Sequence, residues 1–288
     1  MSTRLWKARD VKKCIITPSE LDNKYSRGVL GVITGSAKYP GAAVLTVASA
    51  SATGLGMVRF HSNSGLAHLV LHSNPEIVVQ PGPVTAWLAG SGIDAKRYSD
   101  FTTWLRHRWF TLISKQSVPT ILDAGALHLA GRFNQPTLIT PHAGELARLL
   151  TERGITVTSE AIEGNPKKWA VIASEKLNVV VLLKGAHTVV ADGDSIIELP
   201  VSTPWLATAG SGDVLAGIVG AYNGYARNAA AHTKVMRKHQ NATESAKSVS
   251  TLDKDVWAEA IKQWATGNTI GEKNGWRNAQ ASVLAPTG

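Results

Sequence analysis

The most informative segment of this 288-residue chain is Ala207-Thr208-Ala209-Gly210-Ser211-Gly212-Asp213-Val214-Leu215-Ala216-Gly217. A glycine-rich loop here runs directly into an apolar helix of small residues, which we expect from Val214 to Ala221. Backbone N–H groups at such a helix start can crowd against an anion, and the helix dipole adds positive potential there. The segment therefore predicts an anion site that suits a transferring phosphoryl group.

Asp213 stands at the start of that helix, where it would lie beside the bound anion. A carboxylate next to a phosphate is unfavourable unless it accepts a proton or binds a metal, which suggests a general base acting on an acceptor hydroxyl. The alternative is structural, because an acidic residue in the first turn also complements the helix dipole. The segment by itself does not choose between the two interpretations.

Short apolar runs alternate with helix-like segments between residues 29 and 226. Strands are expected over Val29–Thr34, Met57–Phe60, Glu76–Gln80, Ala86–Ala89, Thr120–Asp123, Thr137–Thr140 and Val179–Leu183. Helices are expected over Ala42–Ala52, Lys96–Phe110, Gly144–Leu150 and Lys167–Leu177. This alternation indicates βαβ units around a mostly parallel sheet. A hairpin of His187–Ala191 and Ser195–Leu199 would make the sheet mixed at one edge.

Polar residues and glycines follow four of the predicted strands, and the glycine-rich loop adds a fifth such segment. Lys184 and Gly185 fit a phosphate-contacting loop, although a solvated lysine in a turn gives the same pattern. His142 can bond a substrate ring, or it can cap the helix that holds Glu145 in its first turn. The remaining segments at strand ends are Leu88-Ala89-Gly90-Ser91-Gly92 and Leu122-Asp123-Ala124-Gly125-Ala126. Together they favour a ligand site at the carboxyl edge of the sheet.

Composition restricts the class of protein. Apolar residues make up 44% of the chain and charged residues 18%, which is typical of a globular enzyme. The single cysteine, Cys14, excludes an intramolecular disulfide framework. The first residues lack the apolar core of a signal peptide, so we expect a cytoplasmic protein that does not enter a membrane. Most of the net charge of +9 lies in residues 1–28 and 224–288, away from the motifs, which argues against a nucleic-acid partner.

Several well-known signatures are absent from the sequence. There is no GxxxxGK[ST] P-loop, no strand-linked GxGxxG fingerprint and no Cys/His set with metal-ligand spacing. Metal-ligating residues are therefore left unassigned.

The segments taken together resemble the NAD(P)H-hydrate dehydratase family, which are ADP- or ATP-dependent repair enzymes of the ribokinase-like superfamily. The resemblance covers roughly residues 20–226 and rests on Lys24-Tyr25-Ser26-Arg27-Gly28, Tyr39-Pro40-Gly41-Ala42-Ala43, Gly54-Leu55-Gly56-Met57-Val58, Thr140-Pro141-His142-Ala143-Gly144-Glu145, Lys184-Gly185-Ala186 and Gly210-Ser211-Gly212-Asp213-Val214-Leu215. It implies a ribokinase-like α/β fold, with a mostly parallel central sheet flanked by helices on both faces.

The resemblance also implies the reaction. The substrate would be NADH or NADPH hydrated at C6 of the nicotinamide ring, and ADP or ATP with Mg²⁺ would phosphorylate that hydroxyl before phosphate is eliminated. Such an enzyme is a carbon–oxygen lyase. Asp213 matches the family's base, and its anion hole matches Gly210, Ser211 and Gly212. Residues matching the nucleotide contacts are Lys184, Gly185, Ala186, His187, Thr188 and Gly212; those matching the dinucleotide contacts are Ala42, Gly92, His142 and Asp213.

The chain departs from the family pattern at a few positions. Ala209 stands where glycine is common, Ser211 where threonine is usual and Ser91 where proline is common. Gly125 replaces a second acidic residue after Asp123, so we expect no carboxylate pair there.

Domain organisation and partners follow from the same comparison. We expect one dehydratase domain over residues 1–288, in which residues 227–288 form a divergent tail with an amphipathic helix near Val256–Trp264. The family implies a homo-oligomer, a tetramer. The chain has no room for the epimerase domain of about 200 residues that many bacterial relatives carry, so epimerisation would need a separate protein.

Two alternatives belong to other functional classes. A ribokinase-like kinase for a vitamin precursor or sugar would stop at a stable phosphorylated acceptor. A non-catalytic nucleotide-binding protein would bind nucleotide without releasing phosphate. Because a fold alone does not fix chemistry, the product of the reaction discriminates among the three.

Overall fold

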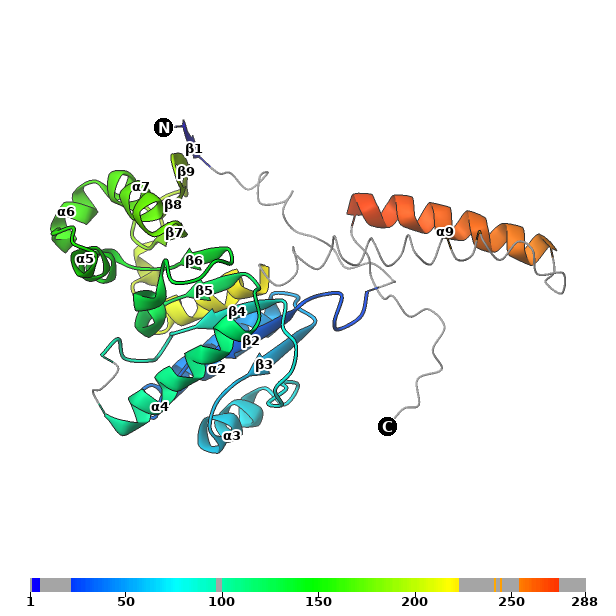
Figure 1. The fold of residues 1–288 in the computed structure, drawn as a ribbon, viewed down its shortest axis with the longest axis horizontal. Helices are drawn as coiled ribbons and strands as arrows, with labels where there is room; N and C mark the ends of the chain where they lie inside the picture. The colour runs from blue at the N-terminus through cyan, green and yellow to red at the C-terminus, as the bar shows by residue number, and fades with distance from the viewer. Residues whose placement is uncertain are drawn as a thin grey trace.

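A computed structural model describes residues 2–5, 22–96, 100–222, 241, 244 and 254–274. Its centre is a nine-stranded sheet in the order β1-β9-β8-β7-β6-β5-β4-β2-β3 (Figure 1). The strands are β1 (Ser2–Leu5), β2 (Val29–Ile33), β3 (Met57–Phe60), β4 (Ala86–Ala89), β5 (Thr120–Leu122), β6 (Thr137–Ile139), β7 (Val180–Leu183), β8 (Val189–Asp192) and β9 (Ser195–Glu198).

The sheet is mostly parallel, as the sequence predicts. The pairs β7–β8 and β8–β9 are antiparallel, which confirms the expected hairpin and the mixed edge. Gly193, with φ of +56°, lies in the turn between its two strands. Beyond the hairpin, β1 pairs in parallel with β9, and the sequence did not predict β1.

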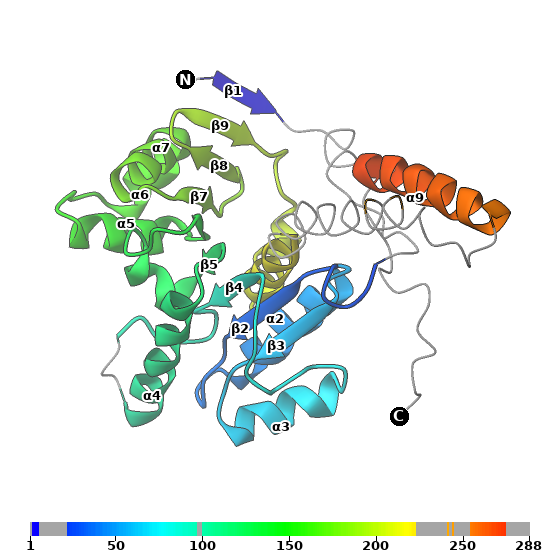
Figure 2. The ribbon, with the colours of Figure 1, turned by 45° about the vertical axis from the view of Figure 1, so that its right-hand side comes forward.

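Helices occupy both faces of the sheet. They are α2 (Pro40–Ala52), α3 (Ser64–Ser73), α4 (Phe101–Trp109), α5 (Ala143–Glu152), α6 (Ser159–Gly164), α7 (Pro166–Leu177) and α9 (Lys254–Asn274), with 3₁₀ turns η1 (Phe110–Lys115), η2 (Ala124–Leu129) and η3 (Pro204–Leu206). A further helix begins at residue 211 and is described to residue 222 (yellow in Figure 1). Figures 1 and 2 both show α9 set apart from these layers.

The core divides into two apolar clusters because successive residues of a strand point to opposite faces. In β5, Ile121 packs into one cluster with α2 and the helix of residues 211–222, while Leu122 packs into the other with α5 and α7. Trp87 of β4 is 1% exposed and lies against Gly31 of β2, where any larger residue would meet its indole ring. This close approach explains a glycine inside a buried strand.

Two predicted elements differ from the structure. Glu76–Gln80 contributes only an isolated bridge from Val78 to Arg59, since the prolines at 75 and 81 interrupt a ladder on either side. The helix expected from Lys96 begins only at Phe101, because the Asp100 side chain accepts a hydrogen bond from the Thr103 N–H and caps it there.

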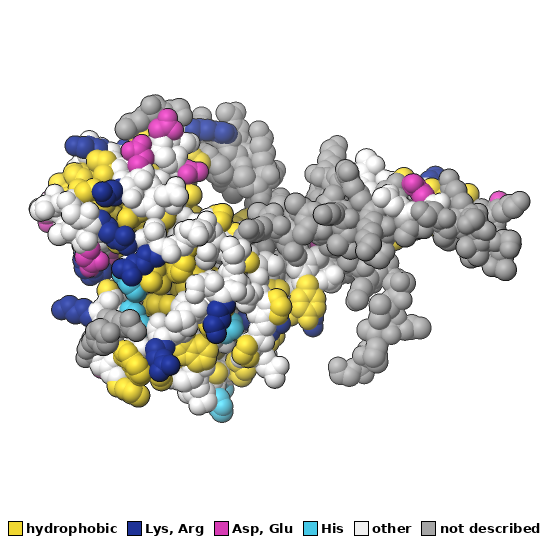
Figure 3. Space-filling model, viewed as in Figure 1, with side chains coloured by type: hydrophobic (Ala, Val, Ile, Leu, Met, Phe, Trp, Pro, Cys, Tyr) yellow, Lys and Arg dark blue, Asp and Glu magenta, His cyan; other side chains and the backbone are white. Residues whose placement is uncertain are grey.

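The tail and the surface bear on the remaining predictions. Val256–Trp264 lies inside the longer helix α9, while residues 227–240 and 275–288 lie outside the described residues. None of the described helices combines the length and apolar character needed to cross a membrane. On the face shown in Figure 3, Lys and Arg side chains are interspersed with apolar and neutral ones.

Candidate functional site

The candidate site lies where the order in which successive strands join the sheet reverses. β3 lies on one side of β2, whereas the next strand in the chain, β4, lies on the other, and β5, β6 and β7 follow beyond it. In an α/β sheet this switch point opens a crevice at the carboxyl ends of the strands. The glycine, acidic, histidine and lysine residues that the sequence places after β2, β4, β5, β6 and β7 therefore meet at one edge.

Asp123, directly after β5, is the polar centre of this edge and is 3% exposed. Its Oδ2 accepts a hydrogen bond from Ser91 Oγ at 2.8 Å, and its Oδ1 accepts one from Thr140 Oγ1 at 2.8 Å. Lys184 Nζ donates to the same Oδ1 at 3.0 Å. A buried carboxylate needs such partners, and here they come from the ends of three neighbouring strands.

Lys184 connects the acidic centre to the glycine-rich loop. Its backbone forms a parallel bridge with His142, and its Nζ lies 3.7 Å from Glu145 Oε2 as well as beside Asp123. A Cβ built on Gly212 would lie 3.6 Å from the same Nζ. The ammonium group therefore stands between two carboxylates and the start of the helix of residues 211–222.

Asp213 lies partly buried in the first turn of that helix. Burial raises the pKa of its carboxyl, the negative charge of Asp123 raises it further, and the positive charge of Lys184 opposes both. A carboxylate with a raised pKa accepts a proton more readily than an ordinary aspartate. The environment of Asp213 thus suits proton transfer.

The glycine-rich loop is held in its shape by backbone geometry. Gly210 has φ of +90°, and a Cβ there would lie 2.6 Å from Leu45 Cδ1, so glycine is required. Ser211 donates both its N–H, at 3.3 Å, and its hydroxyl, at 2.9 Å, to the Thr208 carbonyl. The Val214 N–H donates to the Gly210 carbonyl at 3.0 Å and closes the first helical turn. The partly buried start of the helix lies beside Lys184.

Ala42, at the start of α2, and Gly92, in the loop after β4, lie against each other at the same edge of the sheet. Gly92 has φ of +66°, and a Cβ there would overlap Ala42 Cβ and would lie 3.2 Å from Gly35 Cα. These three small residues bring the loops after β2 and β4 into contact with the start of α2.

His142 acts as the N-cap of α5, which is the structural alternative considered for it. Its Nδ1 accepts hydrogen bonds from the Gly144 N–H at 3.1 Å and the Glu145 N–H at 3.4 Å. The Glu145 carboxylate accepts the His142 N–H at 2.9 Å in return, which completes a capping box. The histidine side chain remains 59% exposed, so the cap leaves part of the ring accessible.

The segment from Gly185 to Thr188 forms a turn between β7 and β8. Gly185, Ala186 and His187 are exposed. Thr188 Oγ1 donates to the Gly185 carbonyl at 3.0 Å, and the Ser202 N–H donates to the Ala186 carbonyl at 3.0 Å. The turn is thereby tied to the chain that leads into the glycine-rich loop.

Some residues of the site carry no clear signal in the sequence. Ser91 and Thr140 stand inside segments quoted above, yet only the structure shows that both bond Asp123. A Cβ on Gly125 would overlap the Ile93 carbonyl, which explains why a second acidic side chain is missing there. Arg106 is buried in α4 and bonds the loop after β2, and nothing in its helical sequence distinguishes it.

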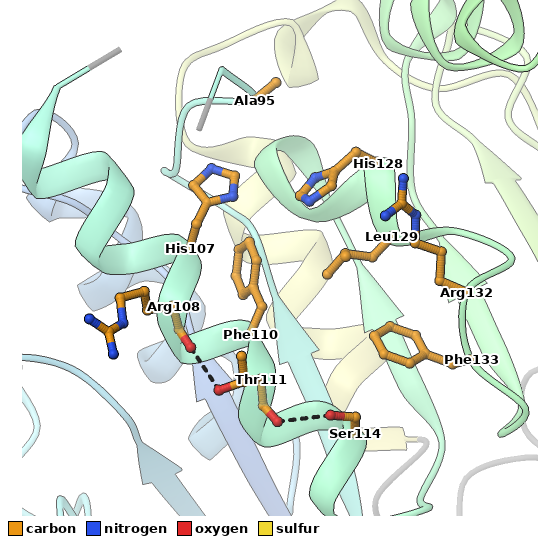
Figure 4. Close-up of a pocket in the computed structure, with 10 residues that line it drawn as sticks. All are labelled: Ala95, His107, Arg108, Phe110, Thr111, Ser114, His128, Leu129, Arg132 and Phe133. Carbon is orange, nitrogen blue, oxygen red and sulfur yellow. Dashed lines mark hydrogen bonds between the residues drawn. The ribbon is translucent and has the colours of Figure 1, made fainter. Parts of the chain in front are cut away.

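A separate hollow of about 590 Å³ lies between α4, η1 and η2 (Figure 4). His107 and His128 both line it, and their ring centroids lie 5.3 Å apart. A ring nitrogen of His107 lies 2.8 Å from the Asp94 carbonyl, and one of His128 lies 2.9 Å from the Gly125 carbonyl. The hollow therefore backs the loops that follow β4 and β5, and its lining includes none of the predicted site residues.

Comparison with known proteins identifies the family. A family model described as NAD(P)H-hydrate dehydratase matches residues 30–263. The bifunctional NAD(P)H-hydrate repair enzyme Nnr of Mycobacterium tuberculosis strain H37Rv is 39% identical over 232 residues, which cover 75% of this chain and 45% of that protein. This chain thus spans about half the length of the curated relatives that it matches first.

Two further likenesses concern the fold and a short segment. The crystal structure of the ADP/ATP-dependent NAD(P)H-hydrate dehydratase from Bacillus subtilis, co-crystallised with ATP/Mg²⁺, superposes with a TM-score of 0.65 at 21% identity, covering 93% of this chain and 99% of that one. A vitamin B12-dependent ribonucleotide reductase of Streptantibioticus cattleyicolor is 55% identical over 74 residues, 26% of this chain and 12% of that protein. The ribokinase-like α/β fold is confirmed, and the chain belongs to the NAD(P)H-hydrate dehydratase family.

Proposed function

We propose that this protein catalyses the ADP- or ATP-dependent dehydration of hydrated NADH or NADPH, a metabolite-repair reaction that regenerates NAD(P)H. The observation that carries the proposal is the meeting of Asp213, Lys184 and Asp123 at the switch point of the sheet, in a chain of this family. This arrangement places a proton acceptor, a cation and a helix start around one position.

The reaction has to convert hydroxide, a poor leaving group, into phosphate. Asp213 accepts the proton of the C6 hydroxyl while that oxygen forms a bond to the terminal phosphorus of the nucleotide, and the bond from phosphorus to the departing nucleotide breaks. The C6–O bond then breaks and its electrons leave with phosphate, which takes up the proton that C5 loses as the C5=C6 double bond returns. The raised pKa of Asp213 favours the first of these proton transfers.

Phosphate binding falls to the glycine-rich loop and to Lys184. Gly210, Ser211 and Gly212 form the proposed anion hole, supported by the helix start beside them. Lys184 lies near Gly212 and carries the positive charge, and Gly185, Ala186, His187 and Thr188 continue the proposed nucleotide contacts. Ala42 and Gly92, which lie in close contact, and the exposed His142 are the proposed contacts for the hydrated dinucleotide.

The side chains present fit Mg²⁺ in its usual mode. Mg²⁺ is commonly held by one or two carboxylates together with phosphate oxygens and water. Asp123 and Glu145 supply two carboxylates, both within 4 Å of Lys184 Nζ, while no cluster of three or more ligating side chains occurs among the described residues. Both oxygens of Asp123 already accept hydrogen bonds, so Glu145 is the carboxylate that would hold the ion together with phosphate oxygens, and the ion would neutralise phosphate charge.

The experiment measures the product. The protein is incubated with enzymatically prepared hydrated NADH, Mg²⁺ and either ADP or ATP, while reduced-nicotinamide absorbance and inorganic phosphate are followed. We expect both signals to rise together, and only when hydrate, Mg²⁺ and nucleotide are all present. A stable phosphorylated acceptor would identify a kinase instead, and bound nucleotide without phosphate release would identify a binding protein.

We further propose a cytoplasmic homo-oligomer, a tetramer, whose partners are small molecules rather than nucleic acid or a membrane. Support comes from the family resemblance and from the charge distribution. The matched relatives are named bifunctional and are about twice as long, so epimerisation of the hydrate is assigned to a separate protein or domain. For domain organisation we propose one domain over residues 1–288 with residues 227–288 as its divergent tail. The distance of α9 from the sheet supports this division.

A further inference from the structure

We infer that Arg106 is a positioning residue for the crevice, which holds the loop after β2 in the shape that receives the hydrated dinucleotide. The inference rests on the proposed function for the identity of that ligand. Its structural basis is a set of hydrogen bonds, described below, that no part of the phosphoryl-transfer chemistry requires.

Arg106 lies on the buried side of α4 and is 2% exposed. Its Nε donates to the Gly35 carbonyl at 2.8 Å, and its Nη2 donates to the Thr34 carbonyl at 2.7 Å. Its Nη1 donates to the His61 carbonyl, at the end of β3, at 3.0 Å. In the described part of the chain the guanidinium forms no ion pair with a carboxylate, so three carbonyl oxygens alone compensate a buried charge.

Such a burial is unfavourable for stability, since an apolar side chain of similar volume is often tolerated at least as well. Burial also lowers the pKa of Arg106 to about 10, which still leaves it protonated at neutral pH. A buried cation that stability alone does not favour points to a role in holding specific backbone groups.

The groups it holds define one wall of the crevice. Two successive peptide units, Thr34–Gly35 and Gly35–Ser36, turn their carbonyls toward Arg106, so their N–H groups point away from it. The Gly35 N–H donates to the Ser91 carbonyl at 2.8 Å, and the Ser36 N–H donates to the Tyr39 carbonyl at 3.4 Å. Through these two peptide units, the Arg106 guanidinium fixes Ser91, which precedes Gly92, and Tyr39, which is the N-cap of α2.

Ser91 and Tyr39 lie close in the chain to Gly92 and Ala42, which are proposed dinucleotide contacts. A Cβ on Gly92 would lie 3.2 Å from Gly35 Cα, 3.1 Å from the Tyr39 carbonyl and in overlap with Ala42. The Gly35 backbone is thus packed closely on this segment and bonded to Ser91, so we expect a shift of Gly35 to displace Gly92, Ala42 or both. Lys184 and Gly212 make no contact with Arg106 among the described residues, so we expect nucleotide binding to change less than dinucleotide binding.

The test compares R106K and R106M with R108K. Lysine keeps the charge but loses the fork, and methionine keeps much of the volume but loses every hydrogen bond. Arg108, two residues along the same helix, is exposed and lies over the Trp104 ring, so R108K is the matched control. Amide hydrogen exchange over residues 34–43 and 90–94, KM for hydrated NADH, kcat and the Kd for ATP are measured for each variant.

We expect faster exchange in both segments and a KM for hydrated NADH raised roughly 10-fold or more in R106K and R106M. The Kd for ATP should stay within about two-fold, and R108K should match the wild type. Equal exchange and KM in all proteins would overturn the inference, as would loss of the folded state in both Arg106 variants, which would assign the residue to the fold alone. A wild-type protein without turnover would instead contradict the proposed function, while the exchange data would still judge Arg106.

Discussion

At the scale of single residues, Asp213 carries the most direct prediction. Asn has nearly the same shape but cannot accept a proton at neutral pH, so D213N should reduce turnover by about 10²–10⁴-fold. Nucleotide affinity should persist or increase, because the carboxylate's repulsion of phosphate disappears. Turnover and the Kd for ATP are measured on one preparation, with D194N in the exposed hairpin turn as the matched control.

The raised pKa of Asp213 gives this variant a second signature. The native state binds the carboxyl proton more tightly than the unfolded chain does, so this group favours the fold below its unfolded pKa and loses that contribution as pH rises through the folded value. At neutral pH, D213N should therefore be at least as stable as the wild type. An active D213N, or one with a clearly lowered melting temperature, would leave Asp213 only its role at the helix start.

Lys184 is the second residue with a separable effect. K184M removes a charged hydrogen-bond donor from the proposed phosphate site, and a loss of nucleotide affinity of about 10–100-fold is expected. Because Lys184 lowers the pKa of Asp213, the acid limb of the pH–rate profile should also move to higher pH in K184M. The exposed Lys176 on α7 provides the control K176M. Unchanged affinity in K184M would contradict the assignment.

The sequence predicts residues of the candidate site only where they stand in local motifs. Lys184 and His142 closely follow strands, and parallel strands bring their carboxyl ends together whatever lies between them. Gly210 and Asp213 stand in a glycine-rich motif at the start of a helix. Arg106 belongs to the middle of a helix, and its partners are backbone carbonyls more than 40 residues away. A local sequence pattern cannot predict such long-range contacts.

At the scale of elements, strands were predictable where several buried apolar residues stand in a row. β2, β4 and β7 are of this kind, since both of their faces are covered. α3 was not predicted from its sequence and depends on the Asn63 cap, whose side chain accepts the Leu66 N–H at 3.1 Å. β1 was not predicted because it exists only through its pairing with β9.

Gly217 is where the helix of residues 211–222 packs closely against α2. A Cβ there would overlap Ser49 Oγ and the Thr46 carbonyl, and it would lie 3.1 Å from the Ala50 nitrogen. G217A should therefore push the two helices apart, lower the free energy of unfolding by about 1–3 kcal/mol and reduce turnover by displacing Asp213. Gly164 at the end of α6 has nothing within 4 Å of its Cβ position, so G164A is the control. A G217A protein as stable and active as G164A would show that the helices are not in this contact.

At the scale of the whole molecule, His61 is expected to limit stability in acid. It is 3% exposed, its ring lies 5.1 Å from that of Trp87, and burial together with Arg59 and Arg106 lowers its pKa to about 4. Unfolding then takes up a proton, so this group removes stability as pH falls from about 6.5 to about 4, by an amount on the order of 3 kcal/mol.

The measurement is denaturant unfolding at several pH values. H61F retains an aromatic ring and removes the titration, so its stability should fall less between pH 6.5 and pH 4 than that of the wild type. His68 is exposed on α3, and H68F should leave the pH dependence as it is. Parallel curves for the wild type and H61F would show that another group governs the acid response.

The packing of residues 211–222 against α2 also has a consequence for how the protein is made. Ribosomes deliver the chain from its N-terminus, and early segments can begin to fold while later ones are still being synthesised. The wall formed by Gly35, Ala42 and Gly92 emerges about 120 residues before Asp213, yet the helix that carries Asp213 must return to α2 at Gly217. A nascent chain therefore holds Gly35, Ala42 and Gly92 well before it holds Asp213, so the proposed site is complete only after this later segment has been synthesised.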